Sequence, residues 1–114
     1  MPRHPRDVAA GVFHVFIHAV WGYPALFRDD LDRLEFLRHL ARVSSHDGFT
    51  CIAFCLMGNH WHQIVEVDDG VLPSAMHDLN LAYALSFNAR AGLRGHVQAD
   101  RYSAPRIHDE DDLL

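Results

Sequence analysis

The stretch FCLMGNHWHQIVEV, residues 54–67, decides how this sequence is interpreted. Its second half is rich in aromatic and β-branched residues, which is typical of a β-strand. Residues i and i+2 of a strand point to the same side, so His60 and His62 would project together while Trp61 faces the other way. The segment therefore predicts a strand that presents two neighbouring imidazoles.

Two further strand segments flank a helix in the first half of the chain. Residues 12–20 are rich in β-branched and aromatic residues and predict a strand, on which His14 and His18 share a face. A helix is expected from Asp29 to the His-Asp-Gly that ends at position 48, because acids open it and leucines follow at helical spacing. The apolar run 49–58 predicts the next strand.

The second half of the chain predicts one more helix. It is expected from Ser74, a suitable N-cap, to about position 91, where Gly92 follows. The rest is expected to be an arginine-bearing loop and an acidic tail. The order β-α-β-β-α, with room for another element, predicts a single α+β domain over residues 1–114. We expect a ferredoxin-like antiparallel sheet with helices packed on one face.

Composition excludes several classes of protein. Hydrophobic residues make up 49% of the chain, which is enough for a core, and no apolar run approaches the roughly 20 residues of a membrane span. The first residues contain charge and proline but no apolar segment, so we expect no secretory signal. We expect a cytoplasmic protein in which Cys51 and Cys55 are buried thiols on one strand face. A zinc site built from these cysteines and distant histidines is an alternative.

The charge distribution is uneven. The net charge is −5, yet all ten basic residues are arginines, and between Leu79 and His108 the only acid is Asp100. Arginine presents planar donors that suit phosphate groups. A nucleic-acid-binding patch is one interpretation of this region, and an ordinary solvated loop is the other. The candidate contact residues are Arg90, Arg94, His96, Gln98 and Arg101.

The histidine pair has its own chemistry. Two adjacent imidazoles suit a divalent metal, with a third ligand supplied by another element. The alternative is a pair of polar histidines on an edge strand. Spacing alone does not decide between them, because the chain contains ten histidines.

Three segments together resemble the HUH tyrosine transposases of insertion sequences and their REP-associated relatives. FCLMGNHWHQIVEV is similar to the Met-Pro-Asn-His-x-His strand of that family, with Gly58 in place of the proline. FHVFIHAVWGYPALFRDDLDRLEFLRHL is similar to its opening strand and first helix. LNLAYALSFNARAGLRGHVQADRYSA is similar to its second helix and the loop that follows. The resemblance covers nearly the whole chain in the same order.

The resemblance implies a specific function. Members hold Mg²⁺ or Mn²⁺ through the histidine pair, here His60 and His62, and act on single-stranded DNA beside a folded hairpin. A tyrosine attacks the phosphate and leaves a 5′-phosphotyrosine. Tyr102 matches a Gly-Arg-Tyr position and would stack on or contact DNA. Some members form homodimers.

One part of the family pattern is not matched. The nucleophilic tyrosine of the family lies on a later helix, and the last residues, RIHDEDDLL, carry no such tyrosine. We expect the chain to be truncated before that helix, so no catalytic residue is assigned and activity as an enzyme stays open. Tyr83, at helical spacing among apolar residues, is expected to be half-buried and to serve in packing instead of as a nucleophile.

Two other interpretations remain at this stage. HWHQIVE fits the His-x-His-x-x-x-Glu pattern of cupins, in which Glu66 would join His60 and His62 at a metal without any DNA. A cupin, however, is an all-β jelly roll, and two long helices argue against it. The third interpretation is a catalytically inactive remnant that still binds DNA.

Overall fold

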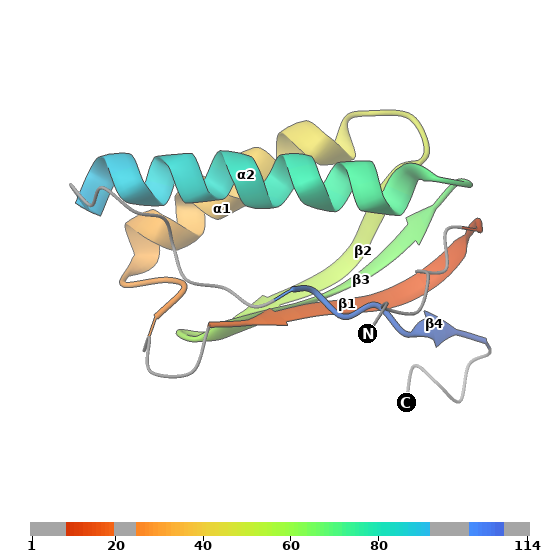
Figure 1. Ribbon diagram of the computed structural model, residues 1–114, viewed down its shortest axis with the longest axis horizontal. Coiled ribbons are helices and arrows are strands. Elements are labelled where there is room, and N and C mark those ends of the chain that lie inside the picture. Colours follow the sequence, from red (N-terminus) through yellow and green to blue (C-terminus); the bar gives the residue numbers. More distant parts are fainter. Residues whose placement is uncertain (1–8, 20–24, 92–100, 109–114) are drawn as a thin grey trace, which may run out of the picture.

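The computed structural model describes residues 9–19, 25–91 and 101–108 and shows a sheet covered on one face by two helices (Figure 1). The strands join in the order β2-β3-β1-β4, and each neighbouring pair is antiparallel. This arrangement confirms the predicted α+β, ferredoxin-like fold. Neither described helix has the length and apolar character needed to cross a membrane. The elements are β1 (Gly11–His18), α1 (Asp30–Ser44), β2 (Phe49–Leu56), β3 (His60–Val67), α2 (Val71–Ala91) and β4 (Arg106–Ile107).

The core lies between the sheet and the helices. Strands β1 and β3 pair along their whole length, with His18 opposite His60 and Gly11 opposite Val67. Alternate residues of β3 are buried on the helix side, and Trp61 is only 2% exposed there. Its ring packs 5.5 Å from the ring of Phe36 on α1. The two faces of β3 therefore differ as the sequence predicted.

Helix α1 begins where the acids of the sequence predict. The Asp29 side chain caps the helix by accepting a hydrogen bond of 3.1 Å from the backbone N–H of Asp32. The helix ends at Ser44, earlier than expected, because Ser45 satisfies the carbonyl of Arg42 through its hydroxyl at 2.6 Å. Gly48 then takes a positive φ of 84°, which reverses the chain into β2.

Helix α2 begins three residues before the predicted start. Val71 is its first residue, and the hydroxyl of Ser74 donates to the Val71 carbonyl at 3.0 Å instead of capping the helix. Pro73 lies in the first turn, where a missing N–H costs no helical hydrogen bond. The prediction that Ser74 caps this helix was therefore wrong.

Strand β2 contains a β-bulge that the sequence did not indicate. Cys51 pairs with Val65 and Ala53 pairs with Ile64, so Ile52 is an inserted residue. Because of the bulge, residues on its two sides that are an even number apart point to opposite faces of the sheet. Cys51 packs against the core, while Cys55 is exposed and pairs with His62. Burial raises the pKa of the Cys51 thiol. The expectation of two buried thiols on one face was wrong.

The segment 101–108 is not simply a loop. It runs antiparallel to β1, and the backbones of Phe16 and Ser103 exchange hydrogen bonds of 2.9 and 2.8 Å. Further along, the short strand β4 places Ile107 opposite Val12. This segment therefore forms the edge of the sheet next to β1.

The stability of the fold is expected to depend on pH through His39 on α1. This residue is 7% exposed, and its Nε2 lies 2.7 Å from the Ser86 hydroxyl. Burial, together with the charges of Arg38 and Arg42, lowers the pKa of His39 below its ordinary value. In the unfolded chain this histidine titrates near about 6.5, so the unfolded state binds more protons below that pH.

The free energy of unfolding is therefore expected to be highest above about pH 7 and to fall as the pH drops below about 6.5. Urea unfolding at pH 7.5 and 5.5 would measure this, with His39→Gln as the control because glutamine keeps a polar group but does not titrate. An equal loss in both proteins would show that His39 is not responsible.

Candidate metal and nucleic-acid site

Four histidines and one phenylalanine gather on the face of the sheet that the helices leave open. We call this set the histidine face, and it consists of His14, Phe16 and His18 on β1 with His60 and His62 on β3. The ring centroids of His60 and His62 are 5.0 Å apart. The rings of the two β1 histidines lie 5.2 Å from those of the pair, His14 against His62 and His18 against His60.

His60 and His62, the two candidate ligands, each form a hydrogen bond through the Nδ1 atom of the ring. The Nδ1 of His60 lies 2.7 Å from the side-chain oxygen of Asn59. The Nδ1 of His62 lies 2.9 Å from the Nε2 of His14. Metal-bound histidines commonly engage their second ring nitrogen in this way. The Nε2 atoms of the pair are thus the ones that remain for a ligand.

The electrostatic environment favours neutral imidazole at His62. Burial lowers the pKa of His62, and the neighbouring His14, His60 and His18 lower it further when they carry charge. Neutral imidazole is the form that binds a metal. His62 is therefore held in its metal-binding protonation state at neutral pH.

The turn before His60 is fixed by three parts of the chain. Met57 donates to the His60 carbonyl at 2.9 Å, and Ala19 donates to the Asn59 carbonyl at 2.8 Å. The Gly58 carbonyl accepts from both Leu26 and Phe27. A Cβ atom at Gly58 would meet nothing within 4 Å, so glycine in place of the family's proline is not required by crowding.

The donor set fits part of a metal site. Over the described ranges, no group of three or more His, Cys, Asp or Glu side chains is arranged to hold a metal ion. The pair His60 and His62 offers two imidazole nitrogens, which suit transition-metal ions better than Mg²⁺, a cation that prefers oxygen. These residues can supply two ligands to a metal ion, and Mn²⁺ accepts imidazole nitrogen more readily than Mg²⁺ does.

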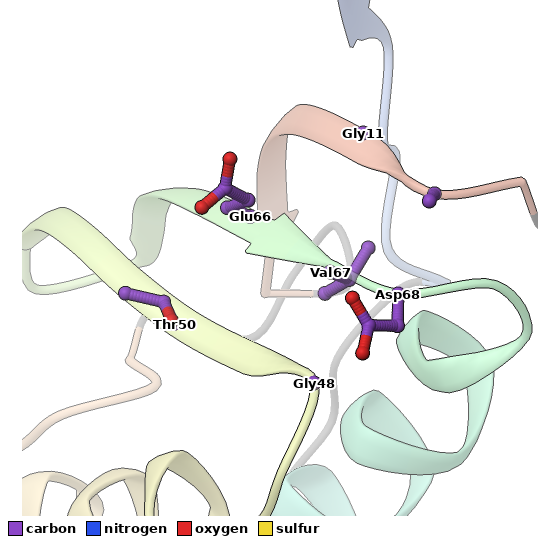
Figure 2. A pocket seen from close by; sticks show the side chains of 7 residues that line it. Gly11, Gly48, Thr50, Glu66, Val67 and Asp68 are labelled. Atoms are coloured by element: carbon purple, nitrogen blue, oxygen red, sulfur yellow. The ribbon is translucent and has the colours of Figure 1, made fainter.

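Glu66 does not complete this site. It points to the same side of β3 as His62, but four residues of strand separate them, about 13 Å at 3.3 Å per residue. Its side chain lies at the far end of the sheet, beside a hollow of about 490 Å³ that Thr50 and Asp68 also line (Figure 2). The sheet and its helices exclude a jelly roll, so the cupin interpretation was wrong.

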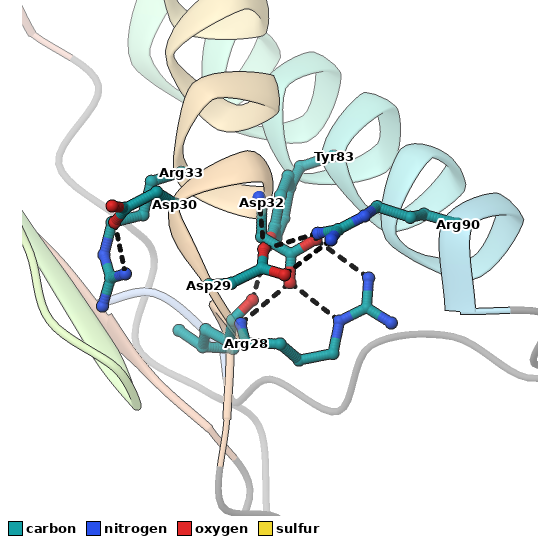
Figure 3. A network of polar contacts seen from close by, with 8 residues as sticks. Arg28, Asp29, Asp30, Asp32, Arg33, Tyr83 and Arg90 are labelled. Atoms are coloured by element: carbon teal, nitrogen blue, oxygen red, sulfur yellow. Dashed lines mark hydrogen bonds and ion pairs between the residues drawn. The ribbon is translucent and has the colours of Figure 1, made fainter.

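Arg90 is held in a network of ion pairs at the start of α1 (Figure 3). Its guanidinium contacts the carboxylates of Asp29 and Asp32, the latter at 2.7 Å, and Arg28 binds Asp32 at 2.8 Å. Burial opposes ionisation of Asp32, yet hydrogen bonds from Arg28 and Arg90 keep its pKa below the ordinary value. The predicted DNA-contact residue Arg90 therefore joins the two helices in this structure.

Tyr83 is a packing residue, as the sequence predicted, but it lies deeper in the core than the half-buried position expected. It is 5% exposed, and its hydroxyl donates to the Leu26 carbonyl at 2.5 Å. Burial raises the pKa of the Tyr83 phenol far above its ordinary value. A buried, protonated phenol on the helix side of the sheet is not available as a nucleophile.

The other predicted DNA-contact residues fall into two groups. Arg101 is exposed, while Tyr102 is half-buried and packs against the core. Both precede Ser103, which bonds to Phe16 of the histidine face. Arg94, His96 and Gln98 lie outside the described residues.

The sequence interpretation did not assign His14 and His18 to the site. Their even spacing on one strand was visible, and it correctly placed them on a common face. Their position beside His60 and His62 follows from the register of β1 against β3, which the spacing does not reveal.

Two solved structures share this fold. A REP-associated tyrosine transposase bound to a REP hairpin has a TM-score of 0.76 at 15% sequence identity, covering 99% of this chain and 66% of that chain. A candidate transposase from Deinococcus radiodurans R1 has a TM-score of 0.67 at 14% identity, covering 99% of this chain and 91% of that one. No family model and no curated protein matches the sequence. The chain thus has the fold of an HUH-type tyrosine transposase and spans about two thirds of the first structure.

Proposed function

We propose that this chain binds single-stranded DNA that carries a hairpin, with a divalent metal held by His60 and His62. The observation that carries the proposal is the pair of adjacent imidazoles, each bonded through Nδ1, on the open face of a transposase fold. A metal at this position would polarise a phosphate of the bound strand. The similar structure that contains a REP hairpin supports DNA as the partner.

The surroundings of the pair suit a nucleic-acid strand. Phe16 lies between three histidine rings, at 5.1 Å from His14, 6.0 Å from His18 and 5.7 Å from His62. Such a cluster of flat rings offers stacking surfaces for unpaired bases. The exposed Arg101 begins the segment beside Phe16 and supplies a cation for phosphate. We therefore place the strand across the histidine face.

The proposal covers binding and assigns no nucleophile among the described residues. Of the tyrosines in that part of the chain, Tyr83 on α2 is buried in the core and Tyr102 packs against the core. The family's cleavage through a phosphotyrosine remains an implication of the resemblance. A homodimer also stays a prediction, and the exposed apolar side chains of Ile52 and Phe54 on β2 are consistent with a partner at that edge.

Electrophoretic mobility shift tests the choice of DNA. In the presence of Mn²⁺, an oligonucleotide with a hairpin and a single-stranded flank is expected to bind, and a full duplex of the same sequence to bind more weakly. Arg101→Ala is expected to weaken binding and to reduce the salt slope by about 1, the effect of losing one phosphate contact. The matched control is Arg38→Ala, an exposed arginine on α1. Equal binding of hairpin and duplex would contradict the proposal.

A further inference from the structure

His14 contacts His62 diagonally across two strands. In the register of the sheet His14 is opposite Ile64 and Phe16 is opposite His62. Diagonal neighbours of this kind are within reach of ring side chains. The two rings are stacked at 25°, and the Nε2 of His14 lies 2.9 Å from the Nδ1 of His62. This distance is that of a hydrogen bond, so one of the two nitrogen atoms carries the proton and the other accepts it.

His60 shows what such a bond does. Its Nδ1 lies 2.7 Å from the side-chain amide oxygen Oδ1 of Asn59, and an amide oxygen can only accept. The proton of a neutral His60 ring is therefore on Nδ1, and the lone pair is on Nε2. A neutral imidazole has one donor and one acceptor nitrogen, so fixing one fixes the other. Asn59 thus sets which nitrogen of His60 is able to bind a metal.

We infer that His14 is a positioning residue that does for His62 what Asn59 does for His60. Its Nε2 accepts the Nδ1 proton of His62, so that the lone pair of His62 is held on Nε2, on the same nitrogen as in His60. His14 itself keeps its proton on Nδ1. This inference rests on the proposed metal-binding role of His62, because the opposite direction of the bond would place a proton on the ligand atom.

His18 provides a natural comparison. It is on the same strand and the same face as His14, and its ring lies 5.2 Å from the ring of the other candidate ligand, His60, at a tilt of 30°. The Nδ1 of His60, however, is bonded to Asn59 and not to His18. Of the two β1 histidines, His14 is therefore the one that bonds to the Nδ1 atom of a candidate ligand.

The first measurement is nitrogen NMR of the imidazole rings in the metal-free full chain at pH 7.5. The His62 ring is expected in the Nδ1–H form. In His14→Phe, which keeps a ring but has no acceptor, the ring is expected to shift toward the Nε2–H form. Calorimetric titration should then show Mn²⁺ affinity reduced about 10–100-fold, the usual loss when a ligand's supporting partner is removed.

Two further variants test whether His14 acts through its hydrogen bond to His62 or only by packing against it. His14→Gln, whose amide oxygen can accept the same bond, is expected to restore both the Nδ1–H form and most of the affinity. His77→Phe, at an exposed position on α2 away from the histidine face, is expected to leave the form of His62 unchanged, with Mn²⁺ affinity close to the original. Thermal unfolding of each variant checks that the fold is kept.

The outcomes distinguish this inference from the proposed function. If the original protein binds Mn²⁺ while His62 is in the Nε2–H form, or if His14→Phe binds as tightly as the original, His14 has no positioning role and the proposed function stands. If the original protein does not bind Mn²⁺, the proposed metal site is wrong, and the role of His14 is wrong with it.

Discussion

Replacing His60 and His62 by alanine together is expected to abolish Mn²⁺ binding and to leave the fold intact. Both rings are only half-buried on the open face, so their removal creates no cavity in the core. The loss of affinity should exceed the roughly 10–100-fold that follows removal of a mere supporting residue. The free energy of unfolding should change by less than about 1 kcal/mol, as at other sites away from the core.

Calorimetry with Mn²⁺ and urea unfolding measure the two quantities on the same samples. His77→Ala is the matched control, because His77 is exposed on α2 and lies apart from the histidine face. Its Mn²⁺ binding should equal that of the original protein. Unchanged heats of binding in the double variant would remove His60 and His62 from the metal site.

Replacing Trp61 by alanine is expected to destabilise the fold and to leave the metal-binding histidines in place. Trp61 is between the two histidines in the sequence, but it faces the core, is 2% exposed and packs against Phe36. Truncating a buried tryptophan removes apolar contacts and leaves a cavity, which costs about 3–5 kcal/mol of the free energy of unfolding. For a domain of this size that is a large part of the total stability.

Urea unfolding followed by circular dichroism measures this loss. Trp61→Phe, which keeps an aromatic ring in the same place, is expected to lose much less. At temperatures where Trp61→Ala remains folded, its histidine pair should still bind Mn²⁺. A loss below about 1 kcal/mol in Trp61→Ala would mean that this side chain is not part of the core.

The pattern of β3 was the part of the fold that the sequence predicted best. Alternate residues of β3 point toward the helices, and two of them, Trp61 and Gln63, are 2% and 1% exposed. The histidines project from the other side of the strand. The alternation of side chains in the sequence indicates which residues are buried, because one face of β3 lies against the core and the other does not. The start of α1 at Asp30 was equally readable, since its cap and acids act locally.

Strand β2 was harder to interpret because Thr50 is its only polar residue. A run that is almost entirely apolar does not show which side chains share a face, so the sequence pattern gave no sign of the bulge at Ile52. The cysteines consequently appeared to share a face when they do not. The start of α2 was misplaced for a local reason, because Ser74 has the side chain of an N-cap, yet Pro73 before it is already part of the first helical turn.

The site was only half predictable. His60 and His62 are near in sequence, whereas the bond between His14 and His62 joins residues 48 apart. Such a contact depends on how two strands align in the finished sheet, which is decided by packing of the whole domain. The ion pairs of Arg90 with Asp29 have the same origin, so a charge pattern alone does not reveal which arginines are paired with acids within the fold.

The most direct test of the proposed site measures whether metal and DNA meet at the histidine pair. The dissociation constant for hairpin DNA is determined with Mn²⁺ and with a chelator, in the original protein and in the His60→Ala/His62→Ala protein. Mn²⁺ is expected to tighten binding in the original protein and to have no effect in the variant, which keeps the metal-free affinity. The same Mn²⁺ effect in both proteins, or no binding of hairpin DNA by the original protein, would contradict the proposal.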